Sequence, residues 1–103
     1  LSLHDALPIS VFNGTTRYYV PYSGTIIAAT MTFGTAPTGS AANVRINVNG
    51  SPQTTISSPA SNLYTRVSSL SIALTADQYI TLDVTQIGST ISGSDLSIQL
   101  ITQ

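Results

Sequence analysis

Apolar and polar side chains alternate along most of this sequence, in short runs that are separated by residues typical of turns. A period of two places successive side chains on opposite faces of a β-strand, so each run predicts a strand with one dry and one wet face. No window keeps the 3.6-residue apolar period of a helix for more than two turns. The strands predicted in this way cover residues 16–20, 25–33, 43–48, 54–57, 64–74, 79–85 and 96–101.

The side chains that the alternation turns inward form the predicted core. About seven or eight short strands must pack in two layers to bury these dry faces. The fold predicted for residues 11–103 is therefore a single all-β domain, an antiparallel β-sandwich or jelly roll. The inward positions are Ile27, Ala29, Met31, Phe33, Val44, Ile46, Val48, Leu70, Ile72, Leu74, Ile80, Leu82, Val84, Leu96, Ile98 and Leu100.

Turn residues indicate how some of these strands connect. Asn49-Gly50 joins two strand candidates and predicts a hairpin with a type I′ turn, because both central residues of that turn have positive φ. Pro52 begins the return strand, which is expected at a sheet edge because proline donates no backbone hydrogen bond. At Ala76-Asp77 an alanine precedes the aspartate, so a turn is expected in which Ala76 does not have positive φ.

Residues 1–10 depart from the pattern, with no alternation and with the only histidine of the chain, His4. Residues 1–9 resemble the in-frame translation of a common sequencing adapter. We therefore interpret residues 1–10 as a non-native assembly scar on a metagenomic gene fragment, in which no paired strand is expected. The alternative is an authentic N-terminal arm. Under the scar interpretation, the native N-terminus of a longer protein would be missing.

Composition narrows the functional classes. Only 7% of the residues are charged, the net charge is −1, and lysine, glutamate, cysteine and tryptophan are absent. Nucleic acid is not an expected partner, because no basic field could displace counterions from phosphates. Membrane insertion is not expected either, since the longest apolar run, residues 26–29, is far too short to cross a bilayer. Without cysteine, disulfides and thiolate chemistry are excluded.

The machinery of common catalytic mechanisms is also missing. Serine and threonine supply 15 residues each, but a nucleophilic hydroxyl needs a neighbouring base and the only imidazole is His4. Asp83 and Asp95 could flank a glycosidic bond, but structural or solvated carboxylates are the favoured interpretation, with Asp95 as a turn cap and Asp83 on a polar strand face. Calcium could use Asp77 together with these two, yet no clustered aspartate motif supports it. We expect no enzyme activity, no cofactor and no metal.

The tyrosines remain as candidate binding residues. A tyrosine offers a flat apolar ring and a hydroxyl, which suits sugar rings and protein interfaces alike. The alternative for each is packing at a rim of the sandwich with its hydroxyl in water. The candidate ligand-binding residues are Tyr18, Tyr19, Tyr22, Tyr64 and Tyr79.

Five stretches combine strand and turn residues, and their combination is a more specific sign of a family than any one stretch. They are residues 19–26, 35–40, 44–50, 74–80 and 86–96. Through them, residues 17–103 resemble a β-sandwich domain found near the C-termini of phage tail fibres and related virion adsorption proteins. Where such domains often carry glycine, this chain has Ala76. The resemblance transfers no functional residue.

This resemblance implies a non-catalytic virion module, a structural or receptor-binding tip domain that is extracellular. Its expected partners are further copies of itself, in a symmetric homo-oligomer such as a trimer, and a host surface glycan. A second hypothesis from another class is a carbohydrate-binding module appended to an enzyme domain that the fragment lacks. The two share a fold type, so fold does not decide between them. Under both, binding is expected through tyrosine rings and hydroxyls, because few charges are available.

Overall fold

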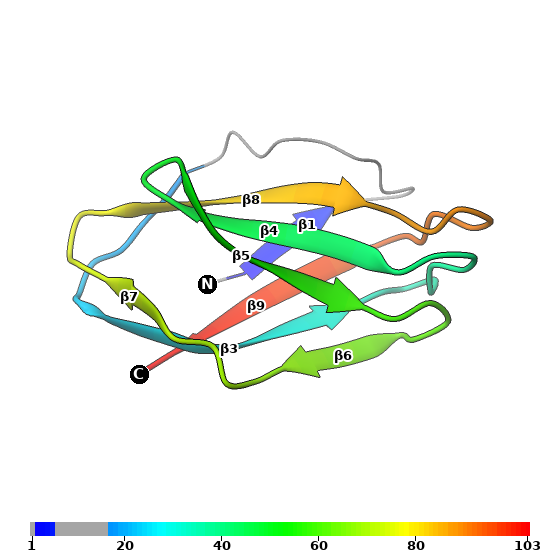
Figure 1. The fold of residues 1–103 in the computed structure, drawn as a ribbon, viewed down its shortest axis with the longest axis horizontal. Coiled ribbons are helices and arrows are strands. Elements are labelled where there is room, and N and C mark those ends of the chain that lie inside the picture. The colour runs from blue at the N-terminus through cyan, green and yellow to red at the C-terminus, as the bar shows by residue number, and fades with distance from the viewer. Residues whose placement is uncertain (1, 6–16) are drawn as a thin grey trace.

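Nine strands in two facing sheets make up the described part of the chain, which is residues 2–5 and 17–103 of the computed structural model (Figure 1). The strands are β1 (Ser2–Asp5), β2 (Tyr18–Tyr19), β3 (Gly24–Thr32), β4 (Ala42–Val48), β5 (Ser51–Ser58), β6 (Tyr64–Val67), β7 (Ile72–Leu74), β8 (Tyr79–Gln86) and β9 (Leu96–Thr102). One sheet has the order β1-β9-β3-β6, with β7 also paired to β3, and the other has the order β2-β8-β4-β5. The pairings are antiparallel.

The two strands β6 and β7 lie end to end along β3, one against residues 29–32 and the other against residues 24–26. Counted as one interrupted strand, they complete two four-stranded sheets whose order is that of a jelly roll. The prediction of an all-β antiparallel sandwich is therefore confirmed. Within the described residues, no helix is long and apolar enough to span a membrane.

The dry faces of the two sheets meet in one hydrophobic core. Burying each aliphatic side chain there contributes about 1.5–3 kcal/mol. On β4, β7, β8 and β9 the inward positions are those that the alternation predicts. The core residues are Ile26, Ala29, Met31, Phe33, Ala42, Val44, Ile46, Val48, Ile56, Ile72, Leu74, Ile80, Leu82, Val84, Leu96, Ile98 and Leu100.

β3 departs from the predicted alternation at one point. Its pairing with β9 shifts register between Ile26 and Ala28, which marks a β-bulge. The extra residue reverses the inward and outward positions in the part of β3 that precedes it. Ile26 is therefore fully buried in the core, and Ile27 is only half-buried. The prediction that Ile27 points inward is therefore wrong, because a single inserted residue reverses the two faces.

The single strand predicted for residues 64–74 is divided between β6 and β7. Ser69 lies between them with a φ of 63°, a left-handed conformation that cannot continue a strand. The backbone N–H of Leu70 donates to the carbonyl of Ile27 at 3.0 Å, so the interruption lies opposite the bulge of β3. Leu70 nevertheless packs against the core, as predicted.

The turns follow their residue types. Asn49 and Gly50 have φ values of 52° and 80°, which confirms the type I′ hairpin between β4 and β5. β5, which contains Pro52, is the last strand of its sheet, so its predicted edge position is also confirmed. In the turn before β8 the positive φ falls on Asp77, at 74°, and Ala76 avoids it as expected.

The N-terminal segment contains a strand that the sequence did not indicate. Residues 2–5 form β1, which pairs antiparallel with residues 96–99 of β9. This corrects the expectation that residues 1–10 hold no paired strand. Backbone groups at an open sheet edge can pair with another segment without any side-chain pattern, so hydrophobic periodicity does not reveal such a strand. The pairing does not bear on the origin of the segment, and residues 6–10 lie outside the described part.

One carboxylate is buried on the outer face of the β2-β8-β4-β5 sheet. Asp83 on β8 is only 4% exposed, so it is a structural carboxylate and not a solvated one. Arg45, on the neighbouring strand β4, donates to its Oδ2 from Nη2 at 2.7 Å and from Nε at 3.1 Å. Asn47 donates to the same oxygen at 2.9 Å. These charge-assisted hydrogen bonds offset the cost of removing the carboxylate from water.

Replacing Gly50 with valine should destabilise the fold, because a β-branched residue resists the positive φ that this turn requires. We expect a cost of about 1–3 kcal/mol, and a melting temperature lower by about 5 °C or more. Ser57→Val is the matched control, since it places the same side chain at an exposed position of β5 where the backbone is extended. Equal melting temperatures for the two variants would contradict the turn assignment.

Replacing Asp83 with asparagine should also destabilise the fold, since it removes the charge that Arg45 and Asn47 contact. The expected loss in free energy of unfolding is about 1–3 kcal/mol, measured by urea titration. Asp95→Asn is the control: Asp95 is exposed and has a φ of 53°, which asparagine also tolerates. A loss in the control as large as that in Asp83→Asn would show that the Arg45 pair has no special weight.

Candidate functional site

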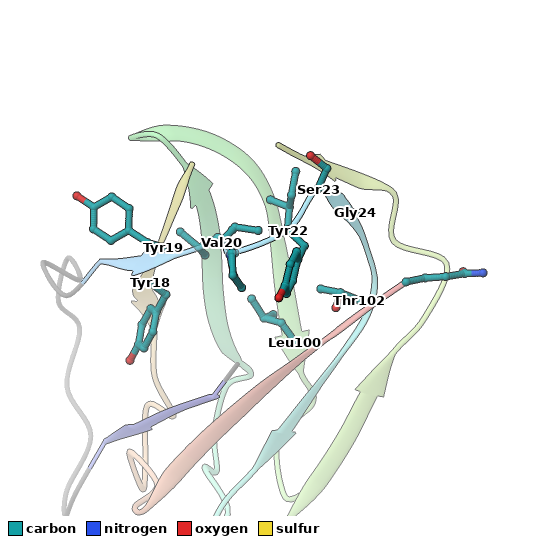
Figure 2. Close-up of a pocket in the computed structure, with 12 residues that line it drawn as sticks. Tyr18, Tyr19, Val20, Tyr22, Ser23, Gly24, Leu100 and Thr102 are labelled. Atoms are coloured by element: carbon teal, nitrogen blue, oxygen red, sulfur yellow. The ribbon is translucent and has the colours of Figure 1, made fainter. Parts of the chain in front are cut away.

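A cavity of about 500 Å³ opens between the two sheets where the chain passes from β2 to β3 (Figure 2). Ligand pockets in proteins commonly have volumes of about 300–1,000 Å³. We call it the β2–β3 cavity. Its lining comprises Tyr18, Tyr19, Val20, Pro21, Tyr22, Ser23, Gly24, Leu74, Ile80, Leu100, Thr102 and Gln103.

The cavity forms because the chain leaves one sheet for the other. Pro21 cannot extend the backbone ladder, so β2 stops after two residues and residues 21–23 cross to the start of β3. The crossing is held by the turn before β8: the N–H of Val20 donates to the carbonyl of Gln78 at 2.8 Å, and the N–H of Ala76 donates to Oγ of Ser23 at 3.1 Å. The segment that borders the cavity is thus attached to the sandwich.

The far side of the cavity is bounded by the end of β9. Thr25 and Gln103 exchange two backbone hydrogen bonds, of 3.1 and 2.9 Å, which bring the start of β3 against the end of the described chain. Gly24 permits this approach, because a Cβ atom there would lie 3.0 Å from the carbonyl oxygen of Gln103. Gly24 therefore lets both strands line one opening.

The floor of the cavity is apolar and its rim is polar but uncharged. Leu74, Ile80 and Leu100 are 5% exposed or less and belong to the core. Ser23 and Thr102 add hydroxyl groups near the surface, and both residues are exposed. No arginine, aspartate or histidine contributes to the lining given by the described residues. The cavity can therefore hold a ligand through ring contacts and neutral hydrogen bonds.

The three tyrosines that the sequence places between residues 18 and 22 all border the cavity. Tyr18 is half-buried against the core, whereas Tyr22 is 81% exposed and Tyr19 is 62% exposed. Figure 2 shows the ring of Tyr22 on the side of Leu100 and Thr102, and the ring of Tyr19 directed away from them. Alternation along β2 explains why Tyr18 is half-buried and Tyr19 is exposed, since adjacent side chains point to opposite faces of the sheet.

Tyr79 does not line the cavity but contacts a residue that does. It pairs with Tyr19 across β2 and β8, and their ring centroids lie 5.8 Å apart at an angle of 55°. The guanidinium carbon of Arg17 lies 4.4 Å from the centroid of the Tyr79 ring. A hydrogen bond with Tyr19, with a further contribution from Tyr79, raises the pKa of Arg17 above its ordinary value. We call Arg17, Tyr19 and Tyr79 the arginine–tyrosine stack.

Tyr64 lies apart from the other candidates. It begins β6 and pairs with Thr32, at the opposite end of β3 from Gly24. Eight residues of extended strand separate those two positions, a distance of about 26 Å. The structure thus brings four of the five candidate tyrosines to one end of the sandwich and leaves Tyr64 at the other.

The aspartates that the sequence offered for catalysis or calcium do not form a site. Asp83 is held by Arg45, while Asp77 precedes β8 and Asp95 precedes β9. Among residues 17–103, no three His, Cys, Asp or Glu side chains lie together in a group that could hold a metal ion.

Sequence reasoning missed two parts of this site. The alternation predicts Leu100 in the core, and it does lie there. It also forms part of the cavity floor, because the two-residue strand β2 covers only a small part of β9. Arg17, which contacts Tyr79 beside Tyr19, enters the sequence argument only through the net charge. Its position beside aromatic residues was a usable signal, since arginine commonly stacks on tyrosine rings.

Comparisons with known proteins match the fold but no family. No protein-family model and no curated protein matches this sequence. A solved structure of the carbohydrate-binding module CBM36 in complex with calcium and xylotriose matches 98% of this chain and 88% of its own, with a TM-score of 0.56 and 15% sequence identity.

A second match is the GH26-CBM35 β-(1,4)-mannanase of Podospora anserina, with a TM-score of 0.52 and 10% identity. It covers 99% of this chain, which spans 25% of the mannanase chain. At these identities the likeness shows the fold alone. The chain folds as a β-sandwich of the kind that these carbohydrate-binding proteins contain.

Proposed function

We propose that this domain is a non-catalytic carbohydrate-binding module that receives a sugar ring in the β2–β3 cavity. The observation that carries the proposal is the cavity lining, which combines an exposed tyrosine rim, an apolar floor and uncharged hydrogen-bonding groups. The fold likeness to CBM36 and to the CBM35-containing mannanase supports it.

The lining matches the chemistry of a sugar ring. A pyranose presents C–H groups on its faces and hydroxyls around its edge, so it needs an apolar surface next to hydrogen-bonding groups. The ring of Tyr22 and the side chain of Leu100 supply the apolar surface. Oγ of Ser23 accepts from the N–H of Ala76 and keeps its own proton to donate, and Thr102 offers a second hydroxyl.

The same lining favours binding over hydrolysis. Glycoside hydrolysis requires two carboxyl groups flanking the scissile bond. No carboxylate side chain lines the cavity among the described residues. A domain that only holds the sugar could work beside a catalytic domain, as the alternative drawn from the sequence proposes. A role in a phage virion stays a prediction from the sequence, and glycan binding is common to both hypotheses.

Replacing Tyr22 with alanine should weaken oligosaccharide binding, because it removes the most exposed ring of the rim. We expect the wild type to bind a neutral trisaccharide with a Kd of about 0.1–1 mM, which corresponds to about −4 to −5.5 kcal/mol. The variant should bind about tenfold more weakly, the effect of one well-placed aromatic contact. Isothermal titration and NMR chemical-shift titration with xylotriose, mannotriose and galactotriose measure both values.

Tyr64→Ala provides the matched control for this experiment. Like Tyr22, Tyr64 is an exposed tyrosine, with exposed fractions of 57% for Tyr64 and 81% for Tyr22, but it lies at the other end of the sandwich. Its removal should leave the Kd unchanged. Equal losses in the two variants, or full binding by Tyr22→Ala, would contradict the placement of the site. Failure of the wild type to bind any of the three sugars would contradict the proposed function.

Oligosaccharide binding should not depend on calcium, although the CBM36 structure contains that ion. The physical reason is that no three carboxylate or imidazole groups come together among residues 17–103, and the cavity lining has none. Titrations in excess EDTA and in excess CaCl₂ should give the same Kd. A Kd that falls several-fold on adding calcium would show that the cavity binds sugar by another route than the one proposed.

A further inference from the structure

The strands at the edges of the two sheets differ greatly in length. β1, β2, β6 and β7 have two to four residues each, whereas β5 has eight. A short edge strand limits the row of unpaired backbone N–H and C=O groups to which another chain can bind. Among the described residues, β5 therefore presents the longest open edge.

The other side of the sandwich's open flank, along β6 and β7, carries features that discourage pairing. Ser69, with a φ of 63°, interrupts that edge, and Arg66 places a charge on it. Comparable protection covers only the start of β5. Pro52 has no N–H, and the register of β4 and β5 shifts beside it, which leaves Gln53 as an extra residue.

Residues 54–58 of β5 have none of these features. They pair with residues 42–46 of β4 without a break in register. Ile56 and Ser58 are buried in the sandwich, whereas Thr55 and Ser57 are exposed on the outer face. No residue of β5 carries a charge, so this edge does not repel an identical edge. The segment is Thr54, Thr55, Ile56, Ser57 and Ser58.

We propose that two copies of this chain pair through residues 54–58 of β5 and form one continuous antiparallel sheet, with four strands from each copy. An antiparallel pair of identical strands has a two-fold axis. With the axis at Ile56, the central residue of the segment, Thr54 lies opposite Ser58 of the partner subunit and Thr55 lies opposite Ser57 of the partner subunit. Hydroxyl side chains on opposite strands form favourable cross-strand pairs.

The surface next to β5 also favours a second copy as the partner. Oγ of Ser58 and Oγ1 of Thr65 lie 2.8 Å apart, which joins β5 to the edge strand β6 of the other sheet. Leu63 and Tyr64 directly precede Thr65 and are 55% and 57% exposed. Two-fold pairing brings the same side of the second copy towards them, so apolar surface lies beside the backbone pairing.

The pairing closes after two copies, because each β5 edge is then occupied. A dimer is therefore expected, and not the trimer that the resemblance to virion proteins suggests. Both β2–β3 cavities stay open, since β2 and β5 lie at opposite ends of the strand order β2-β8-β4-β5. Along the joined sheet, the β2 strands of the two copies are about 34 Å apart, or seven strand spacings. The inference does not rest on the proposed function.

Sedimentation equilibrium of the wild type tests the pairing directly. The weight-average mass should rise from that of one chain towards that of two as the concentration increases from about 10 μM to about 1 mM, because a small interface gives a weak dimer. NMR spectra over the same range should show the largest shifts for the amides of residues 54–58. A constant monomer mass, or growth into larger assemblies, would overturn the proposal.

A chain with both Thr55→Lys and Ser57→Lys should dimerise at least about tenfold more weakly, because the two-fold axis sets like charges opposite each other. The matched control carries Ser71→Lys and Ala73→Lys, which add the same charges at exposed positions in and beside the short strand β7. It should dimerise as the wild type does. Equal weakening in the control would show that net charge, and not the β5 edge, sets the association.

A chain with Thr55→Asp and Ser57→Asp provides a rescue. Alone it should also be monomeric, but mixed with the lysine variant at low salt it should form a one-to-one dimer that weakens as salt is raised. Absence of this mixed dimer would contradict the pairing, whereas its formation shows that both variants fold. The Kd for the neutral trisaccharide should be the same in the lysine variant and the wild type, so failure of dimerisation and failure of sugar binding are distinguishable.

Discussion

The structure depends on the burial of two dry sheet faces against each other, and the cavity lies where that mutual coverage is incomplete. β9 offers seven residues of strand, whereas the nearby β2 in the other sheet has only two before Pro21 turns the chain away. Leu100 and Ile80 are therefore almost fully buried by their neighbours, and they also form the floor of the β2–β3 cavity. The same packing that stabilises the fold thus leaves an apolar surface within reach of a ligand.

Only 7% of the residues are charged, so the position of each charged side chain matters for the stability of the fold. Asp83 and Arg45 form an ion pair on the outer face of one sheet. The Asp83 carboxylate is buried there, so the pair offsets the cost of removing its charge from water. Arg17 is placed differently, on an aromatic ring at the surface.

Affinity at a site of this kind is expected to be modest for one copy. A rim of tyrosines and a few hydroxyls gives a small contact area, and the exposed side chains lose freedom when a ligand orders them. Useful attachment to a polysaccharide or a cell surface would then come from several linked copies or from a neighbouring domain, which raise the effective concentration without new contacts. Both hypotheses drawn from the sequence, the fibre tip and the appended module, meet this requirement.

Hydrophobic periodicity by itself determined the sandwich class, most of the core, the Asn49-Gly50 hairpin and the edge position of β5, because these follow from local patterns of burial and φ. Only the tertiary structure decided that Ile26 and not Ile27 faces the core, since one bulge residue reverses the two faces. It also decided which tyrosines meet: Tyr18, Tyr19 and Tyr22 are close in sequence, but Tyr79 joins them through strand pairing and Tyr64 is carried to the far end of β3. Residue types show which side chains can bind, whereas long-range pairing decides which of them share a surface.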